Sequence, residues 1–225
     1  MTPSPAARVP NETVVGTYDR LATIYDLVLG PLAAGTRRRA LELLRVEAGA
    51  RVVEVGCGPG HALVGLAERV GPTGRVVGID AAPRMVSRAR RRAARAGLAD
   101  RVAVLLGDAR SLPVRDRAAD VAFVEDTLEL FSGEELAAVV AELRRVLAPD
   151  GRLGVVTMER AEAEADPFVR AYDWAFDHVP GYARLGCRPV YARRALEAGG
   201  FVVEREERRR RGYVWPVEIL IARPD

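Results

Sequence analysis

Val52-Val53-Glu54-Val55-Gly56-Cys57-Gly58-Pro59-Gly60 is the segment of this sequence with the clearest structural pattern. Its apolar β-branched residues predict a buried strand of a parallel sheet, and the strand runs directly into glycines at every second position. A β-carbon at any of these glycines would block a close approach to the backbone or forbid its dihedral angles. The loop is therefore expected to come very close to a ligand, with Glu54 just before it.

Strands and helices alternate along the rest of the chain. Strands are predicted at 51–55, 75–79, 102–106, 120–125, 152–158, 201–209 and 217–222. Helices are predicted at 11–28, 32–44, 61–70, 83–97, 132–147 and 189–198. This alternation indicates an open α/β sheet, mostly parallel and covered on both faces. The last two strands follow each other after a short loop, which predicts an antiparallel hairpin at the sheet edge.

The chain is predicted to form a single domain over residues 11–225, after a disordered tail at 1–10. The N-terminal helical segment is expected to act as a lid. Residues 159–187 show no clear period and hold much of the aromatic content, so they are predicted to be an insertion that covers the substrate. Its aromatic residues are Phe168, Tyr172, Trp174, Phe176 and Tyr182.

Composition excludes several classes of function. The 225 residues carry a net charge of only +3, and their 34 basic residues, all Arg, are interleaved with acids. We therefore expect no nucleic-acid partner. Cys57 and Cys187 lie in no metal-ligand spacing, so no metal site is predicted. Met1 to Pro10 lacks a signal-peptide pattern and no apolar run reaches the length of a membrane span, so a cytoplasmic protein is expected.

The run Arg208–Arg211 is the one dense basic segment in the predicted hairpin. Glu204, Glu206 and Glu207 lie close to it in sequence and can act as counter-charges. We interpret the run as a solvated face of the hairpin rather than as a patch for an anionic substrate or a membrane surface.

In open parallel sheets, ligands bind beyond the carboxyl ends of the strands. Four acidic positions fall on or just after those predicted ends, and the topology gathers them around one crevice. They are Glu54, Asp80, Asp108 and Glu125.

The glycine spacing distinguishes between possible ligands. Dinucleotide-binding loops read Gly-x-Gly-x-x-Gly and hold a pyrophosphate at a helix N-terminus. Here the third glycine comes one residue early, and Glu54 would repel a pyrophosphate in a site of low dielectric constant. Asp80 lies 20 residues after Gly60, where a carboxylate can bind a ribose diol. A positively charged nucleoside without phosphates suits these residues, and S-adenosylmethionine is such a molecule.

Four motifs in the same order and spacing then identify a family resemblance. They are the stretch 53–60, Val77-Gly78-Ile79-Asp80, Gly107-Asp108-Ala109-Arg110-Ser111-Leu112-Pro113 and Leu143-Arg144-Arg145-Val146-Leu147-Ala148-Pro149-Asp150-Gly151. With Tyr18 to Asp26, they resemble the class I S-adenosylmethionine-dependent methyltransferases, of the small-molecule group that includes ubiquinone and menaquinone C-methyltransferases. The resemblance covers about residues 17–157 and the closing hairpin. It implies a Rossmann-like, doubly wound sheet of seven strands with an antiparallel C-terminal hairpin strand.

The resemblance also implies roles for individual residues. The loop glycines line the methionine and ribose part of the cofactor, and Asp80 binds the ribose hydroxyls. Asp108 and the Ala109 backbone contact the adenine amino edge. Ala81 and Met85 pack against the adenine face. The full set of expected cofactor-binding residues is Tyr25, Glu54, Gly56, Cys57, Gly58, Gly60, Asp80, Ala81, Met85, Asp108, Ala109 and Glu125.

Simpler interpretations stay open for four of these residues. Glu54 could be an acid at a strand edge without a role in binding, but between two valines it would be poorly placed there, so we favour the binding role. Asp80 could only cap the following helix. Asp108 could be an ordinary turn residue. Cys57 is expected to be a small buried side chain rather than a nucleophile.

The implied reaction is in-line attack of an acceptor nucleophile on the sulfonium methyl group. A general base is needed only if that nucleophile carries a proton near neutral pH. The candidates are His178, Glu125, Asp126 and Tyr172.

The expected partner is a small-molecule acceptor. The stretch after the fourth predicted strand reads Glu125-Asp126-Thr127-Leu128, not the Asn/Asp-Pro-Pro-aromatic motif of many nucleic-acid methyltransferases. Two alternatives stay open: a module that binds S-adenosylmethionine without catalysis, and a methyltransferase acting on nucleic acid or protein. The sequence does not predict the oligomeric state, and a homodimer is one option.

Overall fold

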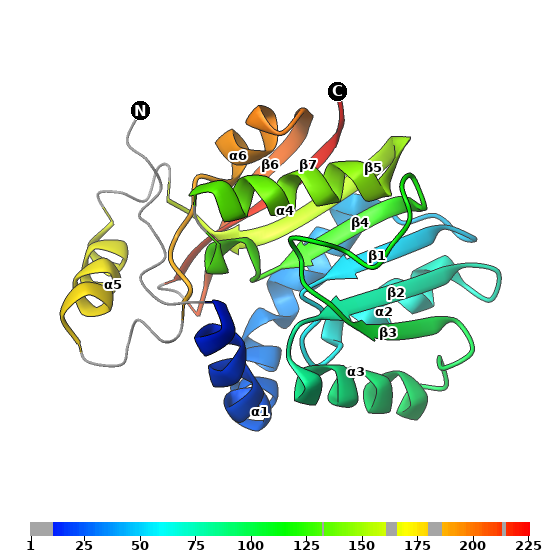
Figure 1. Cartoon of the computed structure of the whole chain (residues 1–225), viewed down its shortest axis with the longest axis horizontal. Helices are drawn as coiled ribbons and strands as arrows, with labels where there is room; N and C mark the ends of the chain where they lie inside the picture. Colours follow the sequence, from blue (N-terminus) through cyan, green and yellow to red (C-terminus); the bar gives the residue numbers. More distant parts are fainter. Residues whose placement is uncertain (1–10, 132, 161–165, 180–185, 213–214) are drawn as a thin grey trace.

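The computed structural model describes residues 11–131, 133–160, 166–179, 186–212 and 215–225, without the side chains at 11, 12, 14 and 21–29. Within this part of the chain, seven strands form one sheet in the order β3-β2-β1-β4-β5-β7-β6 (Figure 1). The strands β1 to β5 run parallel, and β7 pairs antiparallel with both β5 and β6. The predicted fold class is therefore confirmed. The strands are β1 (Arg51–Val55), β2 (Arg75–Asp80), β3 (Val102–Leu106), β4 (Ala119–Glu125), β5 (Leu147–Met158), β6 (Phe201–Arg211) and β7 (Trp215–Pro224).

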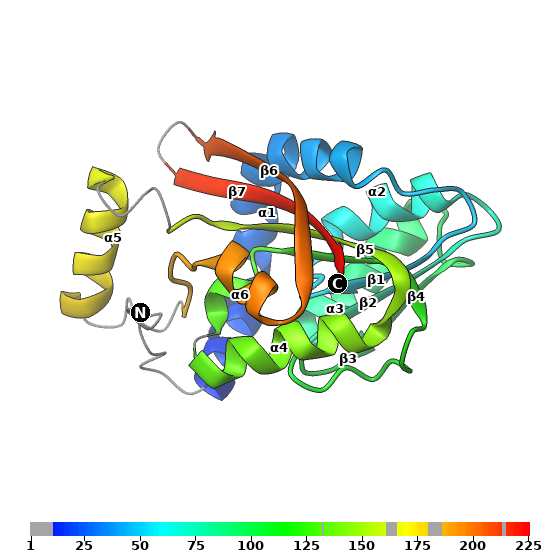
Figure 2. The ribbon, with the colours of Figure 1, turned by 90° about the horizontal axis from the view of Figure 1, so that it is seen from above.

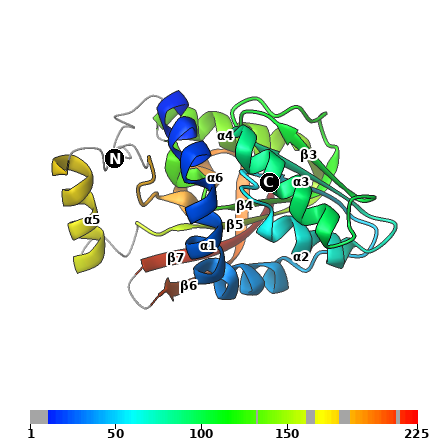
Figure 3. The ribbon, with the colours of Figure 1, turned by 90° about the horizontal axis from the view of Figure 1, so that it is seen from below.

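Helices cover both faces of the sheet. The helices α4 (Gly133–Val146) and α6 (Ala192–Ala198) lie over one face, as seen from above in Figure 2. The opposite face is covered by α1 (Asn11–Leu44), α2 (His61–Val70) and α3 (Pro83–Arg95), which lie in front in Figure 3. The helix α5 (Pro167–His178) stands beside the sheet near the start of β7.

Alternate side chains of β1 supply the two halves of the core. Val53 and Val55 are buried toward α4, in a cluster with Val139 and Leu143. Val52 packs on the other side, in a cluster with side chains of α1 and α2. Because both faces of β1 are buried, the residues around Glu54 must be apolar. For the same reason, a charged side chain at Glu54 costs folding free energy.

Two helical segments differ from the prediction. Gly30-Pro31 was expected to separate two helices, but α1 continues from Asn11 to Leu44 with Pro31 inside it. The helix packs against β5, β7, α2 and α3, and these tertiary contacts outweigh the local cost of proline. Residues 167–178 are helical rather than aperiodic: Pro167 occupies the first turn, and the Asp166 carboxylate accepts a hydrogen bond from Phe168 N at 2.8 Å.

The predicted tail 1–10 and the predicted helix cap Ser132 lie outside the described residues. A lid role for 159–187 stays a prediction, since 161–165 and 180–185 also lie outside them.

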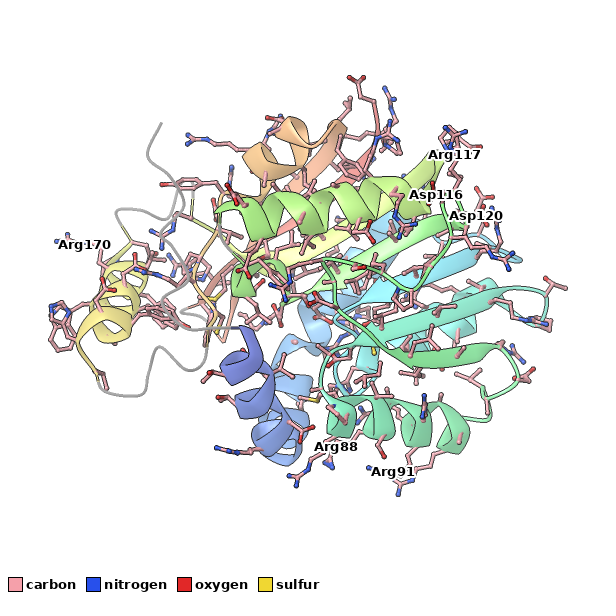
Figure 4. All side chains as sticks on the ribbon, viewed as in Figure 1. Arg88, Arg91, Asp116, Arg117, Asp120 and Arg170 are labelled. Atoms are coloured by element: carbon pink, nitrogen blue, oxygen red, sulfur yellow. The ribbon has the colours of Figure 1, made fainter. Side chains whose placement is uncertain are left out.

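Charged side chains lie mainly at the periphery, where several arginines are paired with acids. Asp120 accepts from Arg51 at 2.5 Å, and Asp116 from Arg145 at 2.7 Å. Figure 4 labels Asp116 and Asp120 at one end of the sheet and Arg91 on the outside of α3. Among the helices described, none combines the length and hydrophobicity that a membrane span requires.

Candidate functional site

The glycine loop connects β1 to α2, and its glycines are needed for different reasons. Gly56 has φ +70°, and a β-carbon there would lie 2.0 Å from Thr127 Oγ1. Gly58 has φ +51°, but a β-carbon there would meet no atom within 4 Å. Both line a cleft at the carboxyl ends of the strands. Gly56 is therefore fixed by packing within the protein, whereas Gly58 leaves free space directly above the backbone.

Asp80, at the end of β2, holds the loop from the side. Its Oδ2 accepts a hydrogen bond from Gly58 N, and its Oδ1 accepts one from Ala82 N, both at 2.8 Å. Burial raises the pKa of Asp80, while the two backbone N–H groups oppose this rise. Each carboxylate oxygen keeps a second acceptor site, so Asp80 can stabilise the loop and bind a ligand hydroxyl at the same time.

One end of the cleft is apolar with a polar edge. Met85 is buried and lines this end of the cleft together with Ala81, Asp108 and Ala109. The Asp108 carboxylate pairs with Arg110, whose Nη2 lies 2.7 Å from Oδ2. The hydrogen bonds from Arg110 lower the pKa of Asp108, which keeps this edge anionic. A flat heterocycle with an amino edge suits this end.

The other end of the cleft is acidic and buried. Glu54 is 2% exposed, and its Oε2 has no hydrogen-bond partner among the described residues. Burial, followed by the proximity of Glu125, raises the pKa of Glu54 well above its usual value. Glu125 Oε2 accepts a hydrogen bond from Arg37 Nε at 2.6 Å, while Oε1 accepts none in the described structure. Burial raises the pKa of Glu125 to about 7, and Arg37 limits the rise.

Asp126 follows β4 and borders both ends of this region. It adopts φ +51°, a left-handed conformation that is uncommon for residues other than glycine but more frequent for aspartate than for most. Its Oδ2 accepts a hydrogen bond from Arg211 Nη1 at 2.6 Å. Arg211 is only 8% exposed, so the prediction of a solvated face is wrong for this residue. The end of β6 turns Arg211 inward to a carboxylate that the local sequence could not identify.

The other three arginines of the run are exposed and paired with acids, as predicted. Arg208 pairs with Glu159 and Glu206, Arg209 with Glu207, and Arg210 with Asp166. Glu206 and Glu207 are two of the three predicted counter-charges.

The structure brings most of the predicted cofactor-binding residues to the cleft and its acidic end. Cys57 is a buried free thiol on the wall of the acidic end, and Gly60, with φ +86°, packs against Ala89. Tyr25 lies in the part of α1 whose side chains are not described. Of the residues predicted from the sequence, those that line the region are Glu54, Gly56, Cys57, Gly58, Asp80, Ala81, Met85, Asp108, Ala109, Glu125 and Asp126.

His178 is not brought to this region. It is exposed at the end of α5, where its ring stacks on Trp174 with centroids 5.2 Å apart. Its Nδ1 lies 2.8 Å from the Trp174 carbonyl oxygen. The described structure thus gives His178 local partners only.

Sequence reasoning missed several residues of the site. Tyr18 and Val15 of α1 line the cleft instead of a described Tyr25 side chain. Arg37 lies four residues after Ala33 and three before Ala40, both of which are buried. This spacing places a charged residue on the buried face of the helix, which could have indicated a role in the site. Glu129 lies between Leu128 and Leu130, and an acid flanked by leucines could likewise have indicated a buried carboxyl.

These groups fit S-adenosylmethionine. The space above Gly58 admits the ligand, the Asp80 oxygens can accept from ribose hydroxyls, and the apolar end suits adenine. Glu54 Oε2 and Glu125 Oε1 accept no hydrogen bond in the described structure, and such buried carboxylate oxygens suit an ammonium group.

Comparisons with known proteins agree with this chemistry. A family model described as a methyltransferase domain matches residues 52–151. Nocamycin O-methyltransferase of Saccharothrix syringae is 41% identical over 138 residues, which are 61% of this chain and 48% of that protein. The chain thus spans about half the length of that relative. The 2-phytyl-1,4-naphtoquinone methyltransferase of Synechococcus elongatus is 30% identical over 80% of this chain and 78% of its own length.

A solved structure shows the same fold. A methyltransferase solved in complex with the Haloferax volcanii Trm112 methyltransferase activator is 21% identical and has a TM-score of 0.73, covering 92% of this chain and 97% of its own. Together with the glycine loop and the match to the Synechococcus enzyme, these findings confirm the predicted family and its cofactor. The chain belongs to the class I S-adenosylmethionine-dependent methyltransferases.

Proposed function

We propose that this protein transfers the methyl group of S-adenosylmethionine to a small-molecule acceptor by in-line displacement. The observation that carries the proposal is the open space above Gly58 between Asp80 and the buried acids Glu54 and Glu125. The names of the two relatives, a nocamycin O-methyltransferase and a phytyl-naphthoquinone methyltransferase, support an acceptor of this size class.

Each part of the cleft has a distinct task in this proposal. Asp80 binds the ribose hydroxyls, while Met85 and the Asp108 edge bind adenine. Glu54 and Glu125 bind the methionine ammonium group. When bound, the cofactor supplies an already activated methyl group, so the protein mainly aligns the acceptor and excludes water.

Binding and turnover test this proposal separately. Calorimetry with S-adenosylmethionine is expected to show one site per chain, and labelled methyl is expected to appear in a small-molecule fraction of cell extract. Labelled methyl recovered only in nucleic acid or protein would contradict the acceptor class. Binding without any transfer would instead indicate a non-catalytic cofactor-binding module.

A further inference from the structure

A second hollow adjoins the cofactor cleft on the side of β5 and β7, and we name it the β5–β7 hollow. It shares Tyr18 and Asp126 with the cleft. Asp126 also borders the acidic end that contains Glu54 and Glu125. A molecule in the β5–β7 hollow would therefore lie next to the methionine end of the cofactor. Its walls are Tyr18, Leu32, Asp126, Glu129, Met158, Cys187, Arg211 and Trp215.

Most of these walls are apolar or aromatic. Met158 is buried and clusters with Tyr172, Phe176 and Trp215. The Trp215 ring lies 5.5 Å from that of Phe168 and 5.8 Å from that of Tyr172, centroid to centroid, so its orientation is fixed by packing. Such walls favour a flat, largely apolar molecule.

Only three of the lining residues carry a charged group: Asp126, Glu129 and Arg211. Asp126 and Arg211 pair with each other at 2.6 Å. Glu129 is 3% exposed, and its Oε2 accepts a hydrogen bond from the neutral hydroxyl of Thr157 at 2.7 Å. The Glu129 carbonyl oxygen accepts from Arg188 N at 2.9 Å, which holds the turn Leu128–Leu130 in place. Glu129 is thus a fixed, buried carboxyl on the wall that accepts its side-chain hydrogen bond from a hydroxyl, while Arg211 acts on it through its charge.

We propose that the β5–β7 hollow binds a flat acceptor with a weakly acidic hydroxyl, such as a phenol or an enol, and that Glu129 accepts its proton. This inference rests on the proposed function. The acceptor oxygen forms a bond to the methyl carbon, while the carbon–sulfur bond breaks and its electron pair stays on sulfur as a neutral thioether. The hydroxyl proton moves to the Glu129 carboxylate and afterwards to water.

The acidity of Glu129 suits this role. Burial, followed by the nearby charge of Asp126, raises its pKa to about 8, and the Thr157 hydroxyl and Arg211 oppose the rise. The Cys187 thiol and the Tyr18 hydroxyl are the other titratable groups on these walls. A carboxylate of this pKa accepts a proton from a phenol at a smaller cost than an ordinary glutamate does, because phenols ionise near pH 10.

Three matched probes and two variants test the inference. Transfer of labelled methyl to 1-naphthol, 1-naphthylamine and 1-naphthoic acid is compared for the wild type, Glu129→Gln and Glu134→Gln. Glu134 is an exposed acid in the first turn of α4 and serves as the control. Calorimetry of 1-naphthol with the S-adenosylhomocysteine complex measures acceptor binding independently of turnover.

We expect methylation of 1-naphthol alone, with a rate that rises with pH up to about 8. Glu129→Gln should lower kcat about a hundredfold and remove this pH dependence. It should change the Kd of 1-naphthol and of S-adenosylmethionine less than threefold, while Glu134→Gln behaves as the wild type.

Preferred methylation of the amine or the acid would overturn the inference, as would a wild-type rate and pH profile in Glu129→Gln. Binding of S-adenosylmethionine without methylation of any probe would overturn this acceptor class and leave cofactor binding intact. Failure of the wild type to bind S-adenosylmethionine would instead overturn the proposed function.

Discussion

Arg37 Nε donates a hydrogen bond of 2.6 Å to Glu125 Oε2, and this pair joins α1 to the end of β4. The two side chains are 13% and 9% exposed, so neither charge is well solvated. The pair closes the acidic end of the cleft next to Glu54. The ionisation of Glu125 and the docking of α1 therefore depend on each other.

Replacing Arg37 by Met should destabilise the protein by about 1–3 kcal/mol at pH 8 and much less at pH 5. The pKa of Glu125 in the folded state is about 7, above its usual 4.5, so ionisation of Glu125 costs stability as pH rises through this window. Without Arg37 the pKa rises further and the cost at pH 8 is larger. Urea unfolding at pH 5 and pH 8 measures the loss in the free energy of unfolding. Arg38→Met serves as the control, because Arg38 is the exposed neighbour of Arg37. An equal loss at pH 5 and pH 8 would contradict the coupling.

Asp80→Ala should weaken binding of S-adenosylmethionine more than tenfold. In the proposed binding mode it removes charge-assisted hydrogen bonds to the ribose, each of which contributes about 1.5–3 kcal/mol. It also removes the acceptors for Gly58 N and Ala82 N. Asp80→Asn keeps one acceptor oxygen, so its affinity for S-adenosylmethionine should lie between those of the wild type and Asp80→Ala. Calorimetry that finds equal affinity in wild type and Asp80→Ala would remove Asp80 from the site.

Gly58→Val should abolish cofactor binding while the protein stays folded. A β-carbon at Gly58 meets no protein atom, so the valine would occupy ligand space only. Gly71→Val is the matched control, since Gly71 also has positive φ and open space but lies outside the cleft. Both variants should lose stability in thermal unfolding, and Gly71→Val at least as much, because Gly71 has φ +67° and ψ −167°, a conformation that valine rarely adopts. Cofactor binding retained in Gly58→Val would place the ligand elsewhere.

The pair of Arg211 and Asp126 should couple strongly in a double-mutant cycle. With side chains 8% and 16% exposed, Arg211→Met and Asp126→Asn are expected to show a coupling energy of about 1–3 kcal/mol in urea unfolding. The exposed pair Arg51–Asp120, with 54% and 41% exposure, should give less than about 1 kcal/mol in the same cycle. Equal coupling in both pairs would mean that Arg211 is solvated in solution.

The layout of the fold follows from local signals in the sequence. β1, α2, β3 and the C-terminal hairpin lie within two residues of their predicted bounds, because apolar runs and glycine turns mark each strand. The continuity of helix α1 through Pro31 could not be predicted from local signals. The contacts that outweigh the cost of a proline inside the helix come from distant parts of the chain.

The candidate site was predictable where the residues lie on strand ends. Glu54, Asp80 and Glu125 fall there because parallel strands end at one edge of the sheet. Arg211 could not be found in this way, because its partner Asp126 is 85 positions away and three neighbouring arginines carry the same local signal.

We propose that S-adenosylmethionine lies in the cleft with its ribose on Asp80 and its methyl group directed to the β5–β7 hollow. A crystal structure of the S-adenosylhomocysteine complex would show both the position of the ribose and the direction in which the sulfur atom faces. We predict ribose hydroxyls within hydrogen-bonding distance of the Asp80 carboxylate and a sulfur atom that faces Asp126 and the hollow lined by Glu129. A ribose away from Asp80, or a sulfur atom facing away from the hollow, would contradict the account.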